Sequence, residues 1–334
     1  MKWSILHNYR GLDSDPFARG AVLLFFVHTS LVLMQSLKRS EVAGDNIVSS
    51  FIIRRVFRLY PLSIVCILIV LALHIPRSFR SGPFSMPGWS AVLANLLLVQ
   101  NITKDASVTL PLWSLPYEMQ VYFLLPFVYL SIRSPRSVRG TMLWFAASAL
   151  AAPIACLVSY QAAYILQFLP CFMAGVVGYK LTSQRQAARW PSWCWTALIL
   201  VLWASYGFAV SLQHVSIWSF SLRNFSAAAI TSLILGWMLP RFRQTTNPSL
   251  VFITKRLAKY SYGIYLAHQS IMWVSFIRFG KLPVPVQWFA FVILAFTLPV
   301  LFFHLVEQPM IEMGRRLSCL ARPRAPNPQL TVSQ

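Results

Sequence analysis

Long apolar runs separated by short polar loops dominate the chain from Gly20 onward. Each run has about 20 residues, enough at about 1.5 Å per residue to cross a hydrocarbon core of about 30 Å. The pattern predicts nine transmembrane helices, at residues 20–37, 57–75, 112–132, 141–159, 164–181, 192–212, 222–240, 258–278 and 286–305. The shorter apolar stretch 91–100 stands near prolines and predicts a re-entrant or interfacial segment. We therefore expect an all-α fold, a polytopic transmembrane helix bundle.

Composition excludes a soluble cytosolic enzyme, because 57% of the residues are hydrophobic, only 11% are charged and the mean hydropathy is +0.60. A net charge of +21 is typical of nucleic-acid binding, but here the basic residues stand in short loops between apolar runs, so we expect no nucleic-acid partner. Alternating the nine spans puts most of the 29 Lys and Arg residues on one side, which the positive-inside rule makes cytoplasmic. The five cysteines show no metal-ligand spacing, and we expect no metal.

We divide the chain into an N-terminal arm (1–19), one membrane domain (20–310) and a tail (311–334) that the charge bias places in the cytoplasm. An odd number of spans then places the arm outside, although the arm has no apolar segment of its own. Either the first span translocates the arm, or the chain begins one helix later than its fold.

Ionisable side chains at membrane depth are costly, so each is a candidate for function. Glu118 lies within the third predicted span, Glu307 at the end of the last, and His28 and His268 within spans. Glu118 fits either a structural hydrogen bond to a neighbouring helix or proton handling beside a catalytic histidine. His268, in a tyrosine-rich run, fits a proton shuttle and a satisfied interior residue equally well, whereas a structural role is favoured for His28.

Three arginines, Arg54, Arg55 and Arg58, stand just before the second predicted span. Spacings of three and four residues allow them to form one cationic edge of a helix. Guanidinium groups bind phosphate oxygens in a bidentate manner. The edge therefore predicts either an anchor to lipid phosphates or a docking site for the phosphates of a cytoplasmic cofactor.

Six motifs follow one another over about residues 20–310: LLFFVHTSLVLM, RRVFRLYP, WSLPYEMQVYFLLP, FMAGVVGY, YSYGIYLAHQ and VEQP. In this order they resemble the motifs of membrane acyltransferase family 3, whose members O-acylate cell-surface glycans and other acceptors. The resemblance implies that acyl-CoA, usually acetyl-CoA, is the donor and binds from the cytoplasm. It also implies that a hydroxyl of a glycan or lipid-linked saccharide is the acceptor.

Carried over to this chain, the resemblance assigns Arg54, Arg55 and Arg58 to the phosphates of CoA. It makes Glu118 the acid of the WSL motif, and we add His268 and His28 as catalytic candidates. The expected substrate pocket consists of Trp113, Ser114, Tyr265 and Glu307.

The family usually has ten spans and begins with a helix that ends in a histidine regarded as essential to transfer, whereas the motifs found here start after that helix. Three explanations stay open: the chain starts inside a longer protein, it is an inactive relative, or another histidine, with His28 first, has taken over the role.

We therefore predict a multi-pass O-acyltransferase of the bacterial inner membrane, surrounded by membrane lipids, that acetylates a polysaccharide of the cell envelope. The alternatives are a transporter or flippase for a lipid-linked glycan and an inactive membrane partner in glycan assembly. Binding of CoA distinguishes the enzyme from the transporter. The oligomeric state is not predicted.

Overall fold

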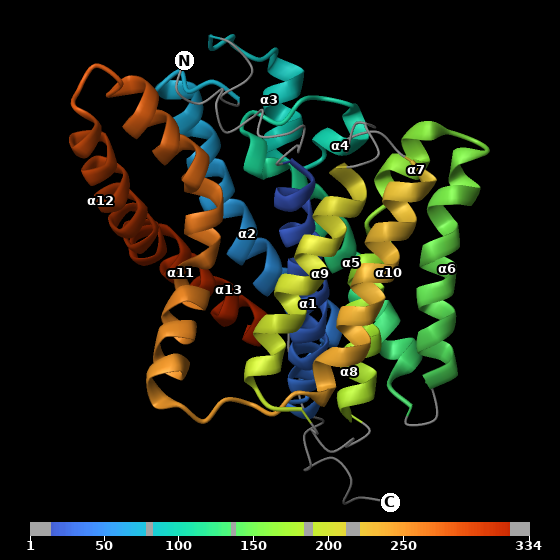
Figure 1. The fold of residues 1–334 in the computed structure, drawn as a ribbon. Helices are drawn as coiled ribbons and strands as arrows, with labels where there is room; N and C mark the ends of the chain where they lie inside the picture. Colours follow the sequence, from blue (N-terminus) through green and yellow to red (C-terminus); the bar gives the residue numbers. More distant parts are fainter. Residues whose placement is uncertain (1–14, 78–82, 135–137, 184–189, 212–220, 321–334) are drawn as a thin grey trace, which may run out of the picture.

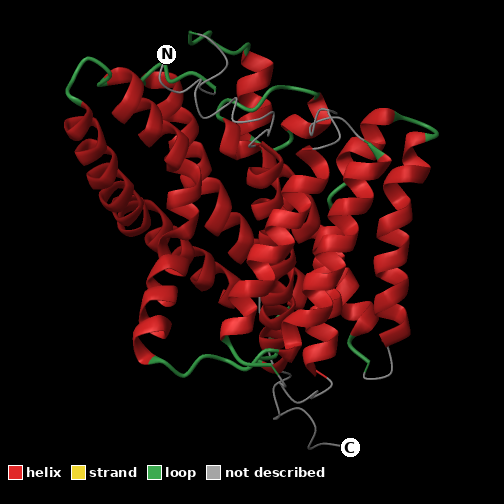
Figure 2. Cartoon of the chain, viewed as in Figure 1, coloured by secondary structure: helices red, strands yellow, loops and turns green. Residues whose placement is uncertain are grey.

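The chain forms a bundle of helices, and its computed structural model describes residues 15–77, 83–134, 138–183, 190–211 and 221–320. Over these residues there is no β-strand, and Trp190 and Phe242 form an isolated bridge. The all-α prediction is therefore confirmed (Figure 2). Long helices run between two ends of the molecule, and short ones gather at the upper end (Figure 1).

The helices are, in chain order, α1 (Asp15–Val42), α2 (Ile47–Ala72), α3 (Trp89–Leu96), α4 (Gln100–Thr103), α5 (Leu115–Ile132), α6 (Val138–Cys156), α7 (Tyr160–Leu166), α8 (Leu169–Ser183), α9 (Trp193–Ser211), α10 (Leu222–Met238), α11 (Pro248–Trp273), α12 (Val284–Phe302) and α13 (Gln308–Leu320). Two 3₁₀ turns, Leu110–Ser114 and Leu239–Arg241, precede α5 and follow α10. Two π-helical segments, Val274–Arg278 and Phe303–Glu307, extend α11 and join α12 to α13.

Seven helical segments among the described residues are long and apolar enough to cross a membrane. They coincide with seven of the nine expected spans, so the bundle of apolar helices is confirmed and the count of nine is not. The other two expected spans, 112–132 and 258–278, fall on α5 and α11. These helices are less apolar because α5 carries Glu118 and α11 carries a group of three cations near its start, Lys255, Arg256 and Lys259.

Several boundaries differ from those expected. Helix α2 begins at Ile47 rather than at 57, because the side chain of Asn46 accepts a hydrogen bond from the Ser49 amide and caps the helix. Arg54 and Arg55, which precede residue 57, therefore lie inside α2 together with Arg58. Helix α1 takes in residues 15–19 of the arm, and α13 takes in residues 311–320 of the tail. Residues 1–14 and 321–334 lie outside the described residues.

Small residues allow the central helices to pack closely. A Cβ atom on Gly175 of α8 would stand 2.0 Å from the Ser30 hydroxyl oxygen and 2.1 Å from the Val27 carbonyl oxygen of α1. On the other side of α8, a Cβ atom on Gly236 of α10 would stand 2.1 Å from the Ala174 carbonyl oxygen. Close backbone approach of this kind is the usual way that helices associate in membranes. It fixes α1, α8 and α10 as a rigid block.

Candidate active site

Helices α2 and α5 carry a cation and a carboxylate that interact electrostatically. Tyr129, near the lower end of α5, donates a hydrogen bond of 2.5 Å to Glu41, near the end of α1. Glu118 lies eleven residues before Tyr129 on α5, and Arg58 lies eleven residues after Ile47 on α2. At about 1.5 Å per residue, each therefore lies about 16 Å along its helix from these residues.

The carboxyl group of Glu118 is the centre of this site and is 6% exposed. Tyr122, one turn later on α5, donates a hydrogen bond to Glu118 Oε1. Arg55 and Arg58 both interact electrostatically with Glu118. A buried carboxylate costs several kcal/mol unless it is paired and hydrogen-bonded, and here both kinds of partner are supplied. This hydrogen bond lies within α5, whereas the first interpretation expected one to a neighbouring helix.

A second buried carboxylate, Glu307, faces the same arginine. Its side chain is 1% exposed, and neither carboxylate oxygen has a hydrogen-bond partner in the described structure. Arg58 is the cation that interacts with it electrostatically. Glu307 is the last residue of a π-helical segment, a feature that is frequent at functional sites. Arg58 therefore interacts electrostatically with two carboxylates from different helical segments.

Two tyrosines of α11 contact residues close in the chain to Glu118 and Arg58. The hydroxyl groups of Tyr265 and Ser114 lie 2.8 Å apart. One turn earlier, Tyr262 donates a hydrogen bond of 2.7 Å to the carbonyl oxygen of Leu59, the neighbour of Arg58. Trp113 packs edge-on against Tyr117, Phe26 and Phe168. Ser114 and Tyr265 thus contact each other, whereas Trp113 belongs to an aromatic cluster, and the expected substrate pocket stays a prediction.

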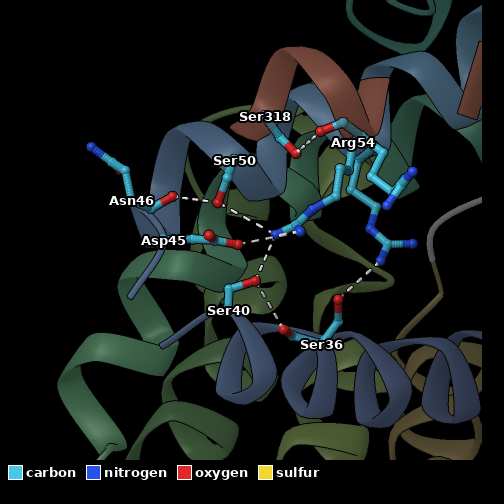
Figure 3. A network of polar contacts seen from close by, with 9 residues as sticks. Ser36, Ser40, Asp45, Asn46, Ser50, Arg54 and Ser318 are labelled. Atoms are coloured by element: carbon cyan, nitrogen blue, oxygen red, sulfur yellow. Dashed lines mark hydrogen bonds and ion pairs between the residues drawn. The ribbon is translucent and has the colours of Figure 1, made fainter. Parts of the chain in front are cut away.

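Arg54 has a separate set of partners, and Figure 3 shows its side chain among Ser40, Asp45 and Ser50. Its guanidinium donates hydrogen bonds to Ser40 at 2.6 Å and to Ser50 at 3.3 Å. It also lies 3.5 Å from a carboxylate oxygen of Asp45. These contacts tie α2 to the end of α1, so Arg54 is held by partners within the protein.

Arg55 lies between the two environments. It donates a hydrogen bond of 3.3 Å to Ser36 and stands 5.4 Å from the centre of the Phe51 ring, while its charge acts on Glu118. The three arginines therefore fan out from α2. Arg58 interacts with the buried carboxylates, and Arg54 binds Ser40 near the end of α1. Arg55 binds Ser36 of α1 and also interacts with Glu118.

The two histidine candidates lie in different places. His268 follows Tyr265 by one turn on α11, is exposed, and its Nδ1–H donates a hydrogen bond of 2.6 Å to the Tyr265 carbonyl oxygen. This bond leaves Nε2 as the nitrogen able to accept a proton. His28 is exposed on another flank of the molecule, between α1 and α9. The structure thus brings His268 near the Tyr265 end of the site and keeps His28 apart from it.

The family suggested by the sequence motifs is also found when the whole chain is compared with models of known protein families. A family model described as an acyltransferase domain, acyltransferase family 3, matches residues 3–304 of the chain. The chain belongs to acyltransferase family 3. No curated protein and no solved structure matches it significantly.

Membership of acyltransferase family 3 and seven apolar helices indicate a multi-pass membrane protein of the acyltransferase class. Within the matched region, Arg55 and Arg58 act electrostatically on Glu118, and Ser114 contacts Tyr265, which sequence spacing alone could not show. Sequence reasoning passed over Tyr122 and Tyr262. Tyr122 had a signal, because it follows Glu118 by four residues and so shares its helix face. Tyr262 had none, since its partner Leu59 is distant in the chain.

Proposed function

We propose that the chain is a membrane O-acyltransferase that moves an acyl group, in the first instance acetyl, from cytoplasmic acyl-CoA to a hydroxyl of a cell-surface glycan or lipid-linked saccharide. The observation that carries the proposal is the electrostatic interaction of Arg58 with two buried carboxylates, Glu118 and Glu307. The bacterial inner membrane and a cytoplasmic C-terminus complete the proposal.

The arrangement suits a donor with several phosphate charges. Arg55 and Arg58 are half-buried and lie on a helix that rises from the lower end, so their guanidinium groups can hold phosphate oxygens through charge-assisted hydrogen bonds. Arg54 supports them by fixing the lower end of α2 against Ser40. In this proposal Arg55 and Arg58 bind CoA directly, and Arg54 positions them.

Acyl transfer to a hydroxyl needs a general base that removes the proton of the hydroxyl. The acceptor oxygen forms a bond to the acyl carbon, the bond from that carbon to the CoA sulfur breaks, and one proton passes from the hydroxyl to the thiolate. A general base within hydrogen-bond reach of the hydroxyl contributes typically about 10²–10⁴-fold to such a step. Glu118, paired with Tyr122, is our first candidate for this proton transfer, and His268 through Nε2 is the second.

The test measures transfer of labelled acetyl from acetyl-CoA to envelope glycans by membranes that contain the 334-residue chain. Arg58→Ala and Glu118→Gln should abolish transfer while insertion into the membrane stays normal. Matched controls are Arg139→Ala, an exposed arginine on α6, and Glu312→Gln, an exposed-face carboxylate on α13 that pairs with Arg315; both should keep full transfer.

A parallel measurement of CoA binding separates the possible outcomes. Loss of binding in Arg58→Ala and retained binding without transfer in Glu118→Gln would support the two assigned roles. Full transfer by both variants would refute the proposal. Transport of a lipid-linked glycan by a protein that binds no CoA would favour the flippase instead.

A further inference from the structure

Two hollows on the flank of α1 join into one groove. One has a volume of about 550 Å³ and the other about 420 Å³, and His28 and Trp195 line both. The larger hollow is otherwise lined by apolar side chains, among them Phe25, Leu200 and Trp203. The smaller one contains most of the polar groups, which are Ser192, Arg243, Gln244 and Thr245. The groove therefore has an apolar chamber and a polar chamber, with His28 and Trp195 between them.

The walls follow from helix periodicity. Ala21, Phe25 and His28 recur every three or four residues and form one stripe on α1. On α9, Trp195 and Trp203 lie two turns apart and face that stripe. Both stripes belong to helices that are long and apolar enough to cross a membrane, so the apolar chamber lies at the depth of hydrocarbon.

The floor of the polar chamber is fixed by the backbone. The Trp190 amide donates to the Arg241 carbonyl oxygen at 3.0 Å, and the Arg243 amide donates to the Trp190 carbonyl oxygen at 2.9 Å. The rings of Trp195 and Phe242 then pack edge-on, with their centres 5.7 Å apart. The segment that carries Arg243 is thereby held against the start of α9, and the chamber is preformed.

His28 is a polar side chain near the middle of an apolar helix, where contact with a polar group would lower its free energy. It stands thirteen residues after Asp15 in the 28-residue helix α1, near the middle of the helix, and its side chain is exposed. An exposed imidazole at that depth faces hydrocarbon at a cost in free energy unless it meets a polar group. In the groove, the polar region of an amphiphilic molecule would supply such a group.

We propose that this groove binds one anionic glycerophospholipid. The phosphate lies in the polar chamber toward Arg243, the ester region meets His28, and an acyl chain follows Phe25 and Trp203 in the apolar chamber. Charge complementarity selects the anionic class, because the Arg243 guanidinium and the His28 imidazole line the polar chamber.

The change from apolar to polar lining along the groove favours a lipid over a helix from another protein. A lipid has an apolar chain that ends in a polar headgroup, whereas a transmembrane helix presents an apolar surface along its length at hydrocarbon depth. The proposal is independent of acyl transfer, since the groove lies apart from Glu118.

The test compares phosphatidylglycerol with phosphatidylcholine of the same acyl chains. Full-length protein in mixed nanodiscs is extracted into detergent, and bound lipid is counted by native mass spectrometry. We expect one phosphatidylglycerol to be retained in preference to phosphatidylcholine. Arg243→Gln should lower retention about fivefold, the effect of one basic residue near an anionic headgroup, and Ala21→Trp, which fills the apolar chamber, should lower it at least as much.

Matched controls lie on the exposed surface of α6, where Arg139→Gln and Ala147→Trp should retain the lipid as the unmodified protein does. A phosphatidylglycerol with a photoreactive acyl chain gives a second measurement that needs no variant, and its cross-links should map to the facing stripes of α1 and α9. Equal retention of both lipids, equal loss in the controls, cross-links spread evenly around the bundle, or a second polypeptide in the groove would each overturn the proposal.

Discussion

The shared cation Arg58 leads to a sharp prediction about stability. Replacement by methionine, which approximates the length of the side chain, leaves Glu118 with Arg55 but leaves Glu307 without the cation that acts on it. Glu118 keeps the hydrogen bond from Tyr122, whereas Glu307 has no hydrogen-bond partner in the described structure. Most of the cost of Arg58→Met should therefore arise at Glu307, and Glu307→Gln in the same molecule should relieve it.

The magnitude follows from the burial of the partners. Breaking a fully buried ion pair costs about 3–5 kcal/mol, because it leaves an uncompensated charge. Glu307 is 1% exposed but Arg58 is only half-buried, so we expect about 2 kcal/mol for Arg58→Met, which is below the range for a fully buried pair. The double variant Arg58→Met/Glu307→Gln should recover most of that, giving a coupling energy within the range of about 0.5–3 kcal/mol found for contacting residues.

The assay is reversible unfolding in mixed micelles with increasing sodium dodecyl sulfate, followed by tryptophan fluorescence, for the unmodified protein, both single variants and the double variant. A control cycle uses Arg315 and Glu312, an exposed pair 2.7 Å apart on α13, which should couple by less than about 1 kcal/mol. The reasoning is refuted if the two cycles give the same coupling energy. Acyl transfer should stay absent in the double variant even when its stability returns, because the phosphate-binding guanidinium is still missing.

Two further predictions concern packing and the pocket. Gly175→Ala should destabilise the bundle by about 3 kcal/mol, the upper end for overpacking, because the added Cβ atom meets the backbone of α1. The control Gly88→Ala should be neutral, because a Cβ atom there meets nothing within 4 Å. Equal yields and equal unfolding midpoints for the two variants would contradict this prediction. Tyr265→Phe removes the contact with Ser114 and should weaken acetyl transfer while CoA binding and Tm remain nearly unchanged; a large fall in Tm would show instead that the contact is structural.

The sequence by itself determined the class of fold and the identity of the family. Apolar runs of membrane length can bury their backbone polar groups only as helices, so helix formation along the chain follows from local composition. The rarity of acids at membrane depth singled out Glu118 and Glu307 for the same reason, since a charge there is costly. These are local properties, and local patterns report them.

The tertiary structure decided which of these residues act together. Arg54, Arg55 and Arg58 belong to one motif, yet their long side chains reach different partners, and only the position of Asp45, Ser36 and the two acids separates them. Those partners come from other helices or turns, so no spacing within the motif predicts the division.

The same holds for the histidines. His28 and His268 both read as ionisable residues within spans, but the packing of α1 against α9 turns His28 toward a groove on the flank, while α11 places His268 beside Tyr265. Rotation of a helix about its axis is set by the contacts of its small residues, such as Ser30 against Gly175. Because these contacts join residues far apart in the chain, the direction in which each histidine points is a property of the assembled bundle.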